Sequence, residues 1–578
     1  MSRRPPDRLL RVDLSAGSVV SEPIPDRWRR RYLGGKGLGA RYLYEELDPG
    51  VDPLGPDNAL LFVLGPLTGL LPGEQRYAAI TKSPLTGTFL DSYAGGAFPG
   101  ALAGALGDHL GVLVVGRAPE PVRLVVEDGD ARIEPAETWG EDAVETARAF
   151  PDAAVACVGP AGEHRVSYAT VASDEADHHA GRGGAGAVMG SKRLKAVLAR
   201  GDPPSPDGAL AALRERDERR HAAGDTGRWL AASGTLETVE FADETGVLAA
   251  RGWRERGFEG AEEVGVEAAR EAAAGRENDG PLPGGFRVET DEGETVPRGA
   301  TGMNLGAGLG IEDFDAVAAL GERCNRLGLD LIGAGNAVSL AIRAADDATL
   351  DRELSFGDPD GARRLLDEIA TRETALGDAL ADGVEAGADR LDADRLVPAV
   401  KALSLPAYDP RGAPSMALAY ATSDRGGCHR RARPVEREVF DGEWRPERAA
   451  AAVAAAQNAR SVRWSLVADD FAGESVAVGA WLDAAGVDHD DLDTAGERVW
   501  NLVRLFNVRE GLDRDDDALP PALAGPDGVS SDRFEAMLDA YYARRGWSPA
   551  GRPTPETLDR LGLGSVRDAA TPAGDPRR

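Results

Sequence analysis

The sequence predicts an α+β protein in which a glycine-rich β-sheet domain is followed by two mainly α-helical domains. Short apolar runs bounded by Gly and Pro fill the first 200 residues, and longer segments rich in Ala, Arg, Glu and Leu follow them. The change falls at the linker-like run Gly201–Pro206, and a softer break lies near residue 400. We therefore expect domains over residues 1–200, 201–400 and 401–564, and a disordered tail over 565–578.

Each element is predicted from its local pattern. The alternation of Leu10, Val12 and Leu14 indicates a first strand. Later strands are predicted from short apolar runs between turn residues, and helices from longer stretches with helical periodicity. The predicted strands are Ala59–Val63, Val112–Val115, Val122–Val126 and Val166–Val171, and the predicted helices are Ala187–Leu198, Leu210–Ala223, Ala316–Leu327 and Ala449–Ala456.

The charge of the chain excludes two classes of partner. A formal net charge of −31 over 578 residues argues against nucleic acid, and an anionic membrane would repel the protein. Lysine occurs only five times, and acidic runs such as Asp513–Asp517 recur, which we interpret as solvated loops. This composition is typical of a halophile's cytoplasm, where high salt screens the repulsion between like charges.

The sequence also predicts a cytoplasmic protein. Its start lacks an apolar signal-peptide core, and its longest apolar stretch, Ala59–Leu71, is interrupted by Gly65 and Pro66. The three cysteines, Cys157, Cys324 and Cys428, lie more than about a hundred positions apart, which gives neither a disulfide framework nor a metal-ligand spacing.

Glycine-rich segments carry the functional signal. Glycine lets backbone N–H groups approach a phosphate or a planar ring, and arginine supplies a planar fork for phosphate oxygens. Four segments combine these residues: Gly34–Gly39, Gly65–Gly96 with Arg76 inside it, Gly159–Glu163 and Gly181–Lys192.

The last of these segments leaves a second interpretation open. Gly181–Gly186 is a literal G-x-G-x-x-G, which is typical of dinucleotide sites when it follows a strand directly. Here the predicted strand Val166–Val171 ends ten residues earlier. A dinucleotide-dependent enzyme therefore stays a minor alternative.

In order and spacing, these segments resemble the pterin-binding domain of the aldehyde ferredoxin oxidoreductase family. The resemblance rests on G-P-L-T-G, T-K-S-P-L-T-G, D-S-Y-A-G-G, G-P-A-G-E and G-R-G-G-A-G-A-V-M-G-S-K as they stand here. A second signature of the family is similar to Lys401–His429, and its N-x-L-G-L-D motif is similar to Asn325–Asp330.

The resemblance implies a cofactor of two pterin dithiolenes around tungsten or molybdenum. The dithiolenes bind the metal in that family, so no side chain is expected as a metal ligand. By position, pterin phosphates would contact Arg76, Gly95, Arg182 and Gly183, and the pterin rings would contact Asn325 and Asp330. His429 would donate or accept protons near the metal, a task that suits imidazole.

The sequence departs from the family at several functional positions. The family holds a [4Fe-4S] cluster with four cysteines, but the matching positions here are Glu277, Gly280, Gly284 and Asp469. The ligands are therefore expected to be missing, because thiolates hold such clusters. The family's acid–base Glu is matched by Ala300, with Glu294 nearby but out of register, and Tyr93 stands where the family has Asn.

These departures leave two functions in contention. One is an oxidoreductase that turns a small aldehyde-type substrate into a carboxylic acid and passes electrons to an acceptor that docks directly. The sequence leaves that acceptor unknown, and the missing cluster ligands make ferredoxin a doubtful one. The other is a non-catalytic scaffold or subunit for an active paralogue. A homodimer and a complex with a paralogue are both left open, since Glu175-x-x-His178 is interpreted as a solvated loop and not as a bridging metal site.

Overall fold

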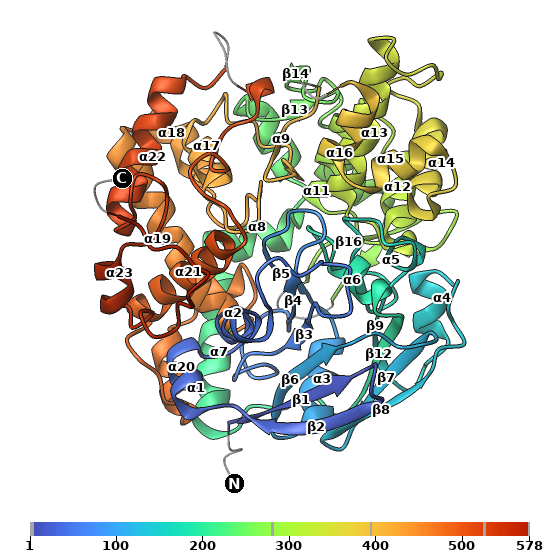
Figure 1. The fold of residues 1–578 in the computed structure, drawn as a ribbon. Coiled ribbons are helices and arrows are strands. Elements are labelled where there is room, and N and C mark those ends of the chain that lie inside the picture. Colours follow the sequence, from blue (N-terminus) through green and yellow to red (C-terminus); the bar gives the residue numbers. More distant parts are fainter. Residues whose placement is uncertain (1–4, 279–282, 394–395, 524–527, 576–578) are drawn as a thin grey trace. The chain divides into compact units, whose positions relative to one another are not determined.

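A computed structural model describes residues 5–278, 283–393, 396–523 and 528–575. The chain divides into two compact units (Figure 1). Unit 1 contains residues 1–231, 325–329 and 458–506, and unit 2 contains residues 232–324, 330–457 and 507–578. Helices α8 (Asp225–Ser233), α12 (Phe314–Leu327), α19 (Pro446–Ser465) and α21 (Leu492–Arg509) carry residues of both units.

Unit 1 is built on two mixed six-stranded sheets. The first has the order β2-β1-β6-β3-β4-β5, and the second has the order β11-β10-β9-β12-β7-β8. The β1–β6 and β7–β12 pairs are parallel, and the other neighbours are antiparallel. The strands are β1 (Arg8–Asp13), β2 (Ser18–Pro23), β3 (Leu60–Val63), β4 (Tyr77–Lys82), β5 (Phe89–Ala94), β6 (His109–Val115), β7 (Val122–Glu127), β8 (Asp130–Pro135), β9 (Ala154–Cys157), β10 (Val171–Ser173), β11 (His178–Ala180) and β12 (Leu194–Arg200).

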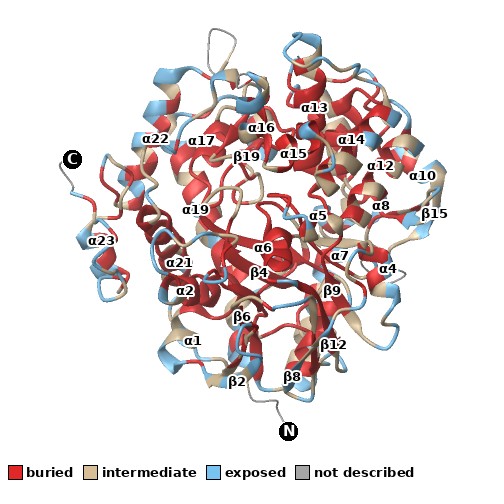
Figure 2. Ribbon diagram, turned by 45° about the vertical axis from the view of Figure 1, so that its right-hand side comes forward, coloured by how far each residue is buried: buried red, intermediate tan, exposed pale blue. Residues whose placement is uncertain are grey.

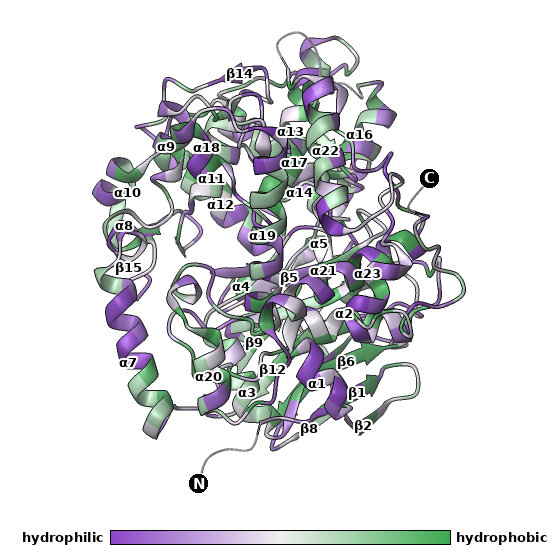
Figure 3. Cartoon of the chain, turned by 90° about the vertical axis from the view of Figure 1, so that its left-hand side faces the viewer, coloured by the Kyte–Doolittle hydropathy of each residue, from purple (hydrophilic) through white to green (hydrophobic). Residues whose placement is uncertain are grey.

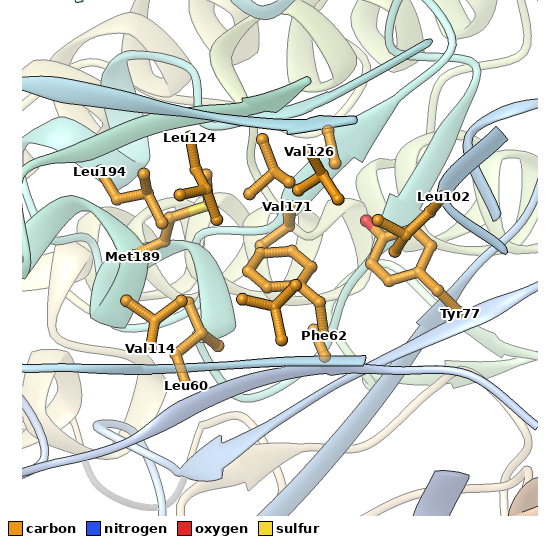
Figure 4. Packing of buried hydrophobic residues seen from close by; sticks show 14 of the residues in the cluster. Leu60, Phe62, Tyr77, Leu102, Val114, Leu124, Val126, Val171, Met189 and Leu194 are labelled. Atoms are coloured by element: carbon orange, nitrogen blue, oxygen red, sulfur yellow. The ribbon is translucent and has the colours of Figure 1, made fainter. Parts of the chain in front are cut away.

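A continuous apolar core lies between the two sheets. Leu60, Phe62 and Val114 point into it from the first sheet, and Leu124 and Val126 meet them from the second (Figure 4). Strands β3, β4 and β5 are buried along their whole length (Figure 2). Burial on both faces explains why β3 appears in the sequence as a continuous apolar run, whereas β4 and β5 also bury polar residues such as Thr81 and Asp91.

Helices complete unit 1. Helix α7 is the longest of those that lie wholly in its described residues, and it is hydrophilic over most of its length (Figure 3). Its buried residues are Asp217 and His221, and the Asp217 carboxylate accepts a hydrogen bond from Trp481. The helices are α1 (Asp26–Tyr32), α2 (Gly35–Glu46), α3 (Phe98–Leu106), α4 (Ala143–Arg148), α5 (Pro160–Glu163), α6 (Ala185–Ser191), α7 (Gly208–Ala223), η3 (Ala472–Ser475) and α20 (Val478–Ala484).

Unit 2 is mainly helical and has only short strands. Its helices are α9 (Thr238–Glu244), α10 (Val266–Ala272), α11 (Gly299–Thr301), η1 (Gly302–Gly306), η2 (Ala307–Leu309), α13 (Leu331–Asp346), α14 (Pro359–Thr371), α15 (Ala375–Ala381), α16 (Val384–Leu391), α17 (Ser415–Ala421), α18 (Val435–Asp441), η4 (Pro521–Leu523), α22 (Ser531–Arg545) and α23 (Pro555–Arg560). Its strands are β13 (Ala249–Ala250), β14 (Glu255–Arg256), β15 (Ala273–Arg276), β16 (Phe286–Glu289), β17 (Glu294–Thr295), β18 (Ala399–Val400) and β19 (Leu403–Ser404).

The structure confirms the predicted fold class, with N-terminal sheets followed by helical regions. Two predicted elements were wrong. The helix predicted over Ala187–Leu198 ends at Ser191, and strand β12 follows, because Leu194 to Ala199 are buried in the second sheet. The strand predicted over Val166–Val171 begins only at Val171.

The predicted domain boundaries and tail stay predictions. Near the end of the chain, the Asp568 carboxylate pairs with Arg509 at 3.2 Å and accepts a hydrogen bond from the Thr571 backbone. In the part of the chain that the structure describes, no helix is long and apolar enough to cross a membrane.

Candidate cofactor site and signature loop

Three of the glycine-rich motifs meet at strands β4 and β5. The Ser92 hydroxyl of D-S-Y-A-G-G donates to the Arg182 carbonyl at 3.1 Å, and the Ser83 hydroxyl of T-K-S-P-L-T-G donates to the Gly183 carbonyl at 2.7 Å. A serine within β5 and a serine directly after β4 therefore hold the G-R-G-G segment in place. This arrangement explains why serine recurs in both motifs.

The backbone at Gly183 requires glycine. Its φ is +88°, and a Cβ there would lie 2.7 Å from a methyl carbon of Leu90. An L-residue would be strained in this conformation and would also displace a buried core side chain. Arg182 beside it is buried and also left-handed, with a φ of 70°.

Arg76 and Gly95 lie together around one carboxylate. The Arg76 guanidinium contacts Glu74 at 2.7 Å, and a Cβ on Gly95 would lie 2.1 Å from the Glu74 carboxyl carbon. Asp469 and Asp470 approach the same guanidinium at 3.9 and 4.0 Å. Arg76 therefore lies among carboxylates in this structure, and a phosphate could bind it only if Glu74 turned away.

A buried ion pair lies beneath the same loops. Lys36 of the first motif contacts Asp91 at 3.1 Å, and both side chains are fully buried. The lysine nitrogen lies 5.2, 5.5 and 5.8 Å from the ring centroids of Phe89, Trp464 and Trp500. Cation–π attraction and the paired carboxylate together compensate for the loss of water around the ammonium.

Tyr93 is joined to this pair. Its hydroxyl donates to the Asp91 carboxylate at 2.7 Å, and its ring stacks on Trp464 with centroids 5.5 Å apart. The Trp464 indole in turn donates to Asp470 at 3.2 Å. The tyrosine that departs from the family pattern therefore links the β5 loop to the Trp464–Asp470 segment.

The third motif packs on the segment that contains Asn325. A Cβ on Gly159 would lie 2.7 Å from the carbonyl oxygens of Arg326 and Leu327, so glycine permits this close approach. The Thr170 backbone donates to the Gly328 carbonyl at 2.8 Å. Asn325 is thus held beside the second sheet, within unit 1.

Asp330 and His429 belong to unit 2. Asp330 caps helix α13, because its carboxylate accepts from the Gly333 backbone at 3.0 Å, a role that favours aspartate for structural reasons alone. The half-buried His429 ring packs at 5.6 Å from the ring of Tyr408.

His429 lies in a segment that buried polar contacts fix closely. We call residues 420–431 the signature loop. The Asp424 carboxylate pairs with Arg431 at 2.7 Å, and the Asp424 carbonyl accepts from Asn507 at 2.7 Å. Gln457 donates to the Thr422 hydroxyl at 3.1 Å, and Arg425 donates to Cys428 at 3.3 Å.

The position matched to the family's acid–base Glu is close to an irregular helix. Ala300 lies in helix α11, and the π-helix η1 follows at Gly302–Gly306, where Asn304 donates to the Ala300 carbonyl at 2.8 Å. A π-helical turn often marks a functional position. Glu294 lies on strand β17, half-exposed and 3.5 Å from Arg287.

The described residues do not fit an iron–sulfur cluster. Glu277 makes a bidentate pair with Arg298 at 2.7 and 3.0 Å, and Gly284 lies against that carboxylate. The Asp469 carboxylate accepts from the backbones of Phe471 and Ala472 at 2.8 and 2.7 Å. Gly280 lies outside the described residues.

The three cysteines do not supply the missing thiolates. All three are buried, and none forms a disulfide. Burial raises the pKa of Cys157 to about 12, and burial likewise raises the pKa of Cys324, so both stay protonated thiols at neutral pH. Thiolates are the required ligands of such clusters.

The glycine backbone and the two arginines are chemically suited to a planar, phosphate-bearing cofactor, provided that Glu74 turns away from Arg76. Arg76 and Gly95 lie at one end of the paired strands β4 and β5, whereas Arg182 and Gly183 are held by Ser92 of β5 and by Ser83, just past the other end of β4. Asn325 lies in the same unit, whereas Asp330 and His429 lie in unit 2. Sequence reasoning missed the partners of Lys36 because Trp464 and Trp500 are more than 400 positions away.

The chain is similar to known proteins along most of its length. The N-terminal domain of aldehyde ferredoxin oxidoreductase matches residues 9–201, and domains 2 and 3 of that family match residues 212–563. The tungsten-containing aldehyde ferredoxin oxidoreductases of Pyrococcus abyssi and Pyrococcus furiosus are each 32% identical, over 96% of this chain and 98% of theirs.

Two more distant proteins are similar over nearly their full length. The WOR-like subunit of an aliphatic sulfonate oxidoreductase from Pyrococcus furiosus is 25% identical over 97% of both chains. A solved structure, the active site complex BamBC of benzoyl coenzyme A reductase with 1,5-dienoyl-CoA, has a TM-score of 0.83 at 24% identity over 98% of both chains, which shows a shared fold. From its two domain matches and its near full-length relatives, the chain belongs to the aldehyde ferredoxin oxidoreductase family.

Proposed function

We propose that the protein is a tungsten- or molybdenum-pterin oxidoreductase that converts an aldehyde to a carboxylic acid without an iron–sulfur cluster. The near full-length similarity to tungsten-containing aldehyde ferredoxin oxidoreductases carries the proposal. The reaction joins RCHO and water and yields RCOOH, two protons and two electrons. The electrons pass to a redox carrier that docks directly, because the cluster that serves ferredoxin has no ligands here.

The proposed roles of individual residues follow from the family motifs in which they lie. Arg182 and Gly183 would contact pterin phosphates from the segment that two serines hold, and Arg76 and Gly95 would contribute further phosphate contacts. Asn325 and Asp330 would contact the pterin rings. The bound cofactor supplies a centre that accepts two electrons. His429 would take up protons from the reaction at an imidazole nitrogen, and its half-buried ring keeps a route to solvent.

One observation favours a second function. Ala300 stands where the family has its acid–base Glu, and its methyl group cannot transfer a proton. A non-catalytic scaffold or subunit for an active paralogue would explain that loss. Tight association with a second chain, together with inertness toward all aldehydes, would support the scaffold. A homodimer, a complex with a paralogue and a salt-rich cytoplasm stay predictions.

Elemental analysis tests the proposal directly. The protein is purified in high salt without oxygen, and its tungsten, molybdenum and iron are measured before an aldehyde screen with a viologen dye as acceptor. About one tungsten or molybdenum per chain, no iron and dye reduction are expected. About four irons per chain would refute the loss of the cluster. A metal-loaded but inert chain would favour the scaffold.

A further inference from the structure

The signature loop is held by a strained hairpin in unit 2. Strands β18 and β19 pair through a turn of only two residues, Lys401 and Ala402, whose φ values are 52° and 59°. Such turns favour Gly, Asn and Asp, because other residues are strained at positive φ. A lysine at this position indicates that its side chain makes contacts that offset the strain.

The Lys401 ammonium makes an ion pair and two hydrogen bonds to backbone carbonyls. The side chain is only 2% exposed and pairs with the fully buried Asp517 carboxylate at 2.7 Å. The same nitrogen donates to the backbone carbonyls of Ala421 and Ser423, within the signature loop. One buried cation therefore holds two carbonyls of the loop that contains His429.

Asp517 is itself held from the other side. The Tyr542 hydroxyl donates to its second oxygen at 2.6 Å. Asp517 ends an acidic run that the sequence led us to interpret as a solvated loop, and that interpretation was wrong for this residue because it is fully buried. A buried carboxylate is costly unless it is paired, and the Lys401 ammonium and the Tyr542 hydroxyl supply that pairing.

The hairpin also contacts the signature loop at Gly426 and Gly427. The Gly427 backbone donates to the Val400 carbonyl at 3.0 Å. A Cβ on Gly426 would lie 2.7 Å from Cβ of Leu403, so this glycine permits the close approach. The hairpin thus holds the loop at two places. One comprises Ala421 and Ser423, before Asp424, and the other is Gly427, two residues before His429.

We propose that Lys401 and Asp517 are positioning residues that fix the signature loop and thereby set the orientation and exposure of His429. The catalytic importance of that orientation rests on the proposed function, but the positioning itself is a property of the chain. Removal of the Lys401 ammonium should therefore change the orientation and exposure of the His429 side chain. Relief of the strain in the turn, with the ammonium still present, should leave both unchanged.

Two neighbouring glycine substitutions separate these effects. Lys401→Gly and Ala402→Gly both place glycine at a left-handed position of the same turn, but only the first removes the ammonium. Asp517→Asn, which keeps shape and removes charge, is a milder second variant. Leu365→Ala, in the buried face of helix α14 of the same unit, controls for a general loss of stability.

The measurement is the rate at which diethyl pyrocarbonate acylates each of the seven histidines, resolved by peptide mass spectrometry in high salt. The exposed His164 serves as the internal reference. We expect the His429 rate to rise about tenfold in Lys401→Gly and to rise in Asp517→Asn, with no change in Ala402→Gly or Leu365→Ala. Equal His429 rates in the two glycine variants would overturn the proposal, as would an equal rise in Leu365→Ala. Because the test needs no metal and no substrate, a failed aldehyde screen leaves its outcome unaffected.

Discussion

Replacing Lys36 with methionine is expected to destabilise unit 1 more than removing both charges of its ion pair. Lys36 and Asp91 are fully buried and 3.1 Å apart, so the single variant leaves a carboxylate without its cation. Breaking a buried pair in this way costs about 3–5 kcal/mol. The loss of three aromatic contacts to the ammonium acts in the same direction.

The double variant Lys36→Met/Asp91→Asn should recover part of the loss. The introduced asparagine would still accept the Tyr93 hydroxyl, and no charge of the pair would remain buried. We expect the double variant to be about 2 kcal/mol more stable than Lys36→Met alone, a non-additive result for two contacting residues. At about 2–4 °C per kcal/mol for a unit of roughly this size, Lys36→Met should lower the melting temperature by about 10 °C.

Thermal unfolding in high salt, followed by circular dichroism, provides the assay. Hydrogen exchange of the β5 amides, measured on the same samples, assigns the loss to unit 1. The reasoning is refuted if the double variant is as unstable as, or less stable than, Lys36→Met. That result would mean that the ammonium contributes through packing and not through compensation of the Asp91 charge.

Three further predictions concern other parts of the protein. Gly183→Ala should destabilise the protein and lower its tungsten or molybdenum content, because φ is +88° and a Cβ would lie against Leu90. The control Gly87→Ala, at φ +68° with open space around it, should cost only the backbone strain of about 1 kcal/mol. Equal effects of the two variants on the melting temperature and on metal content would contradict this prediction. Burial raises the pKa of Asp174 from 3.8 to about 6, so between these values the folded state binds more protons than the unfolded state. The free energy of unfolding should therefore fall as the pH rises through about 6. Asp174→Asn should flatten that slope in urea titrations. Dialysis into low salt should unfold the chain, whose net charge is −31, and an unchanged circular dichroism spectrum would argue against halophilic adaptation.

The sequence was most informative where short motifs recur in order. Ser83, Ser92 and the Arg182–Gly183 segment could be grouped before the structure was known, because each lies in a motif whose glycines and serines serve backbone contacts. The helix predicted over Ala187–Leu198 failed because apolar runs buried on both faces show no period that separates strand from helix.

Long-range charge pairing could not be predicted from local pattern. Asp517 closes an acidic run that is locally indistinguishable from a solvated loop, yet it pairs with Lys401, more than a hundred positions earlier. Lys36 and Trp500 are likewise far apart in the chain. Pairing of this kind depends on how distant segments pack, and no short-range periodicity encodes it.

The discontinuity of unit 1 has a consequence for the order in which the protein matures on the ribosome. Gly34 and Gly65 lie against the backbone of Ser465 and Leu466, and Lys36 needs rings from Trp464 and Trp500. During synthesis, the first 231 residues emerge long before these partners exist. Until then, the Lys36 ammonium and the apolar loops that these partners cover in the folded protein are exposed. Nascent chains of this protein should therefore depend on chaperones until translation passes residue 506, and a fragment of residues 1–231 expressed alone should aggregate.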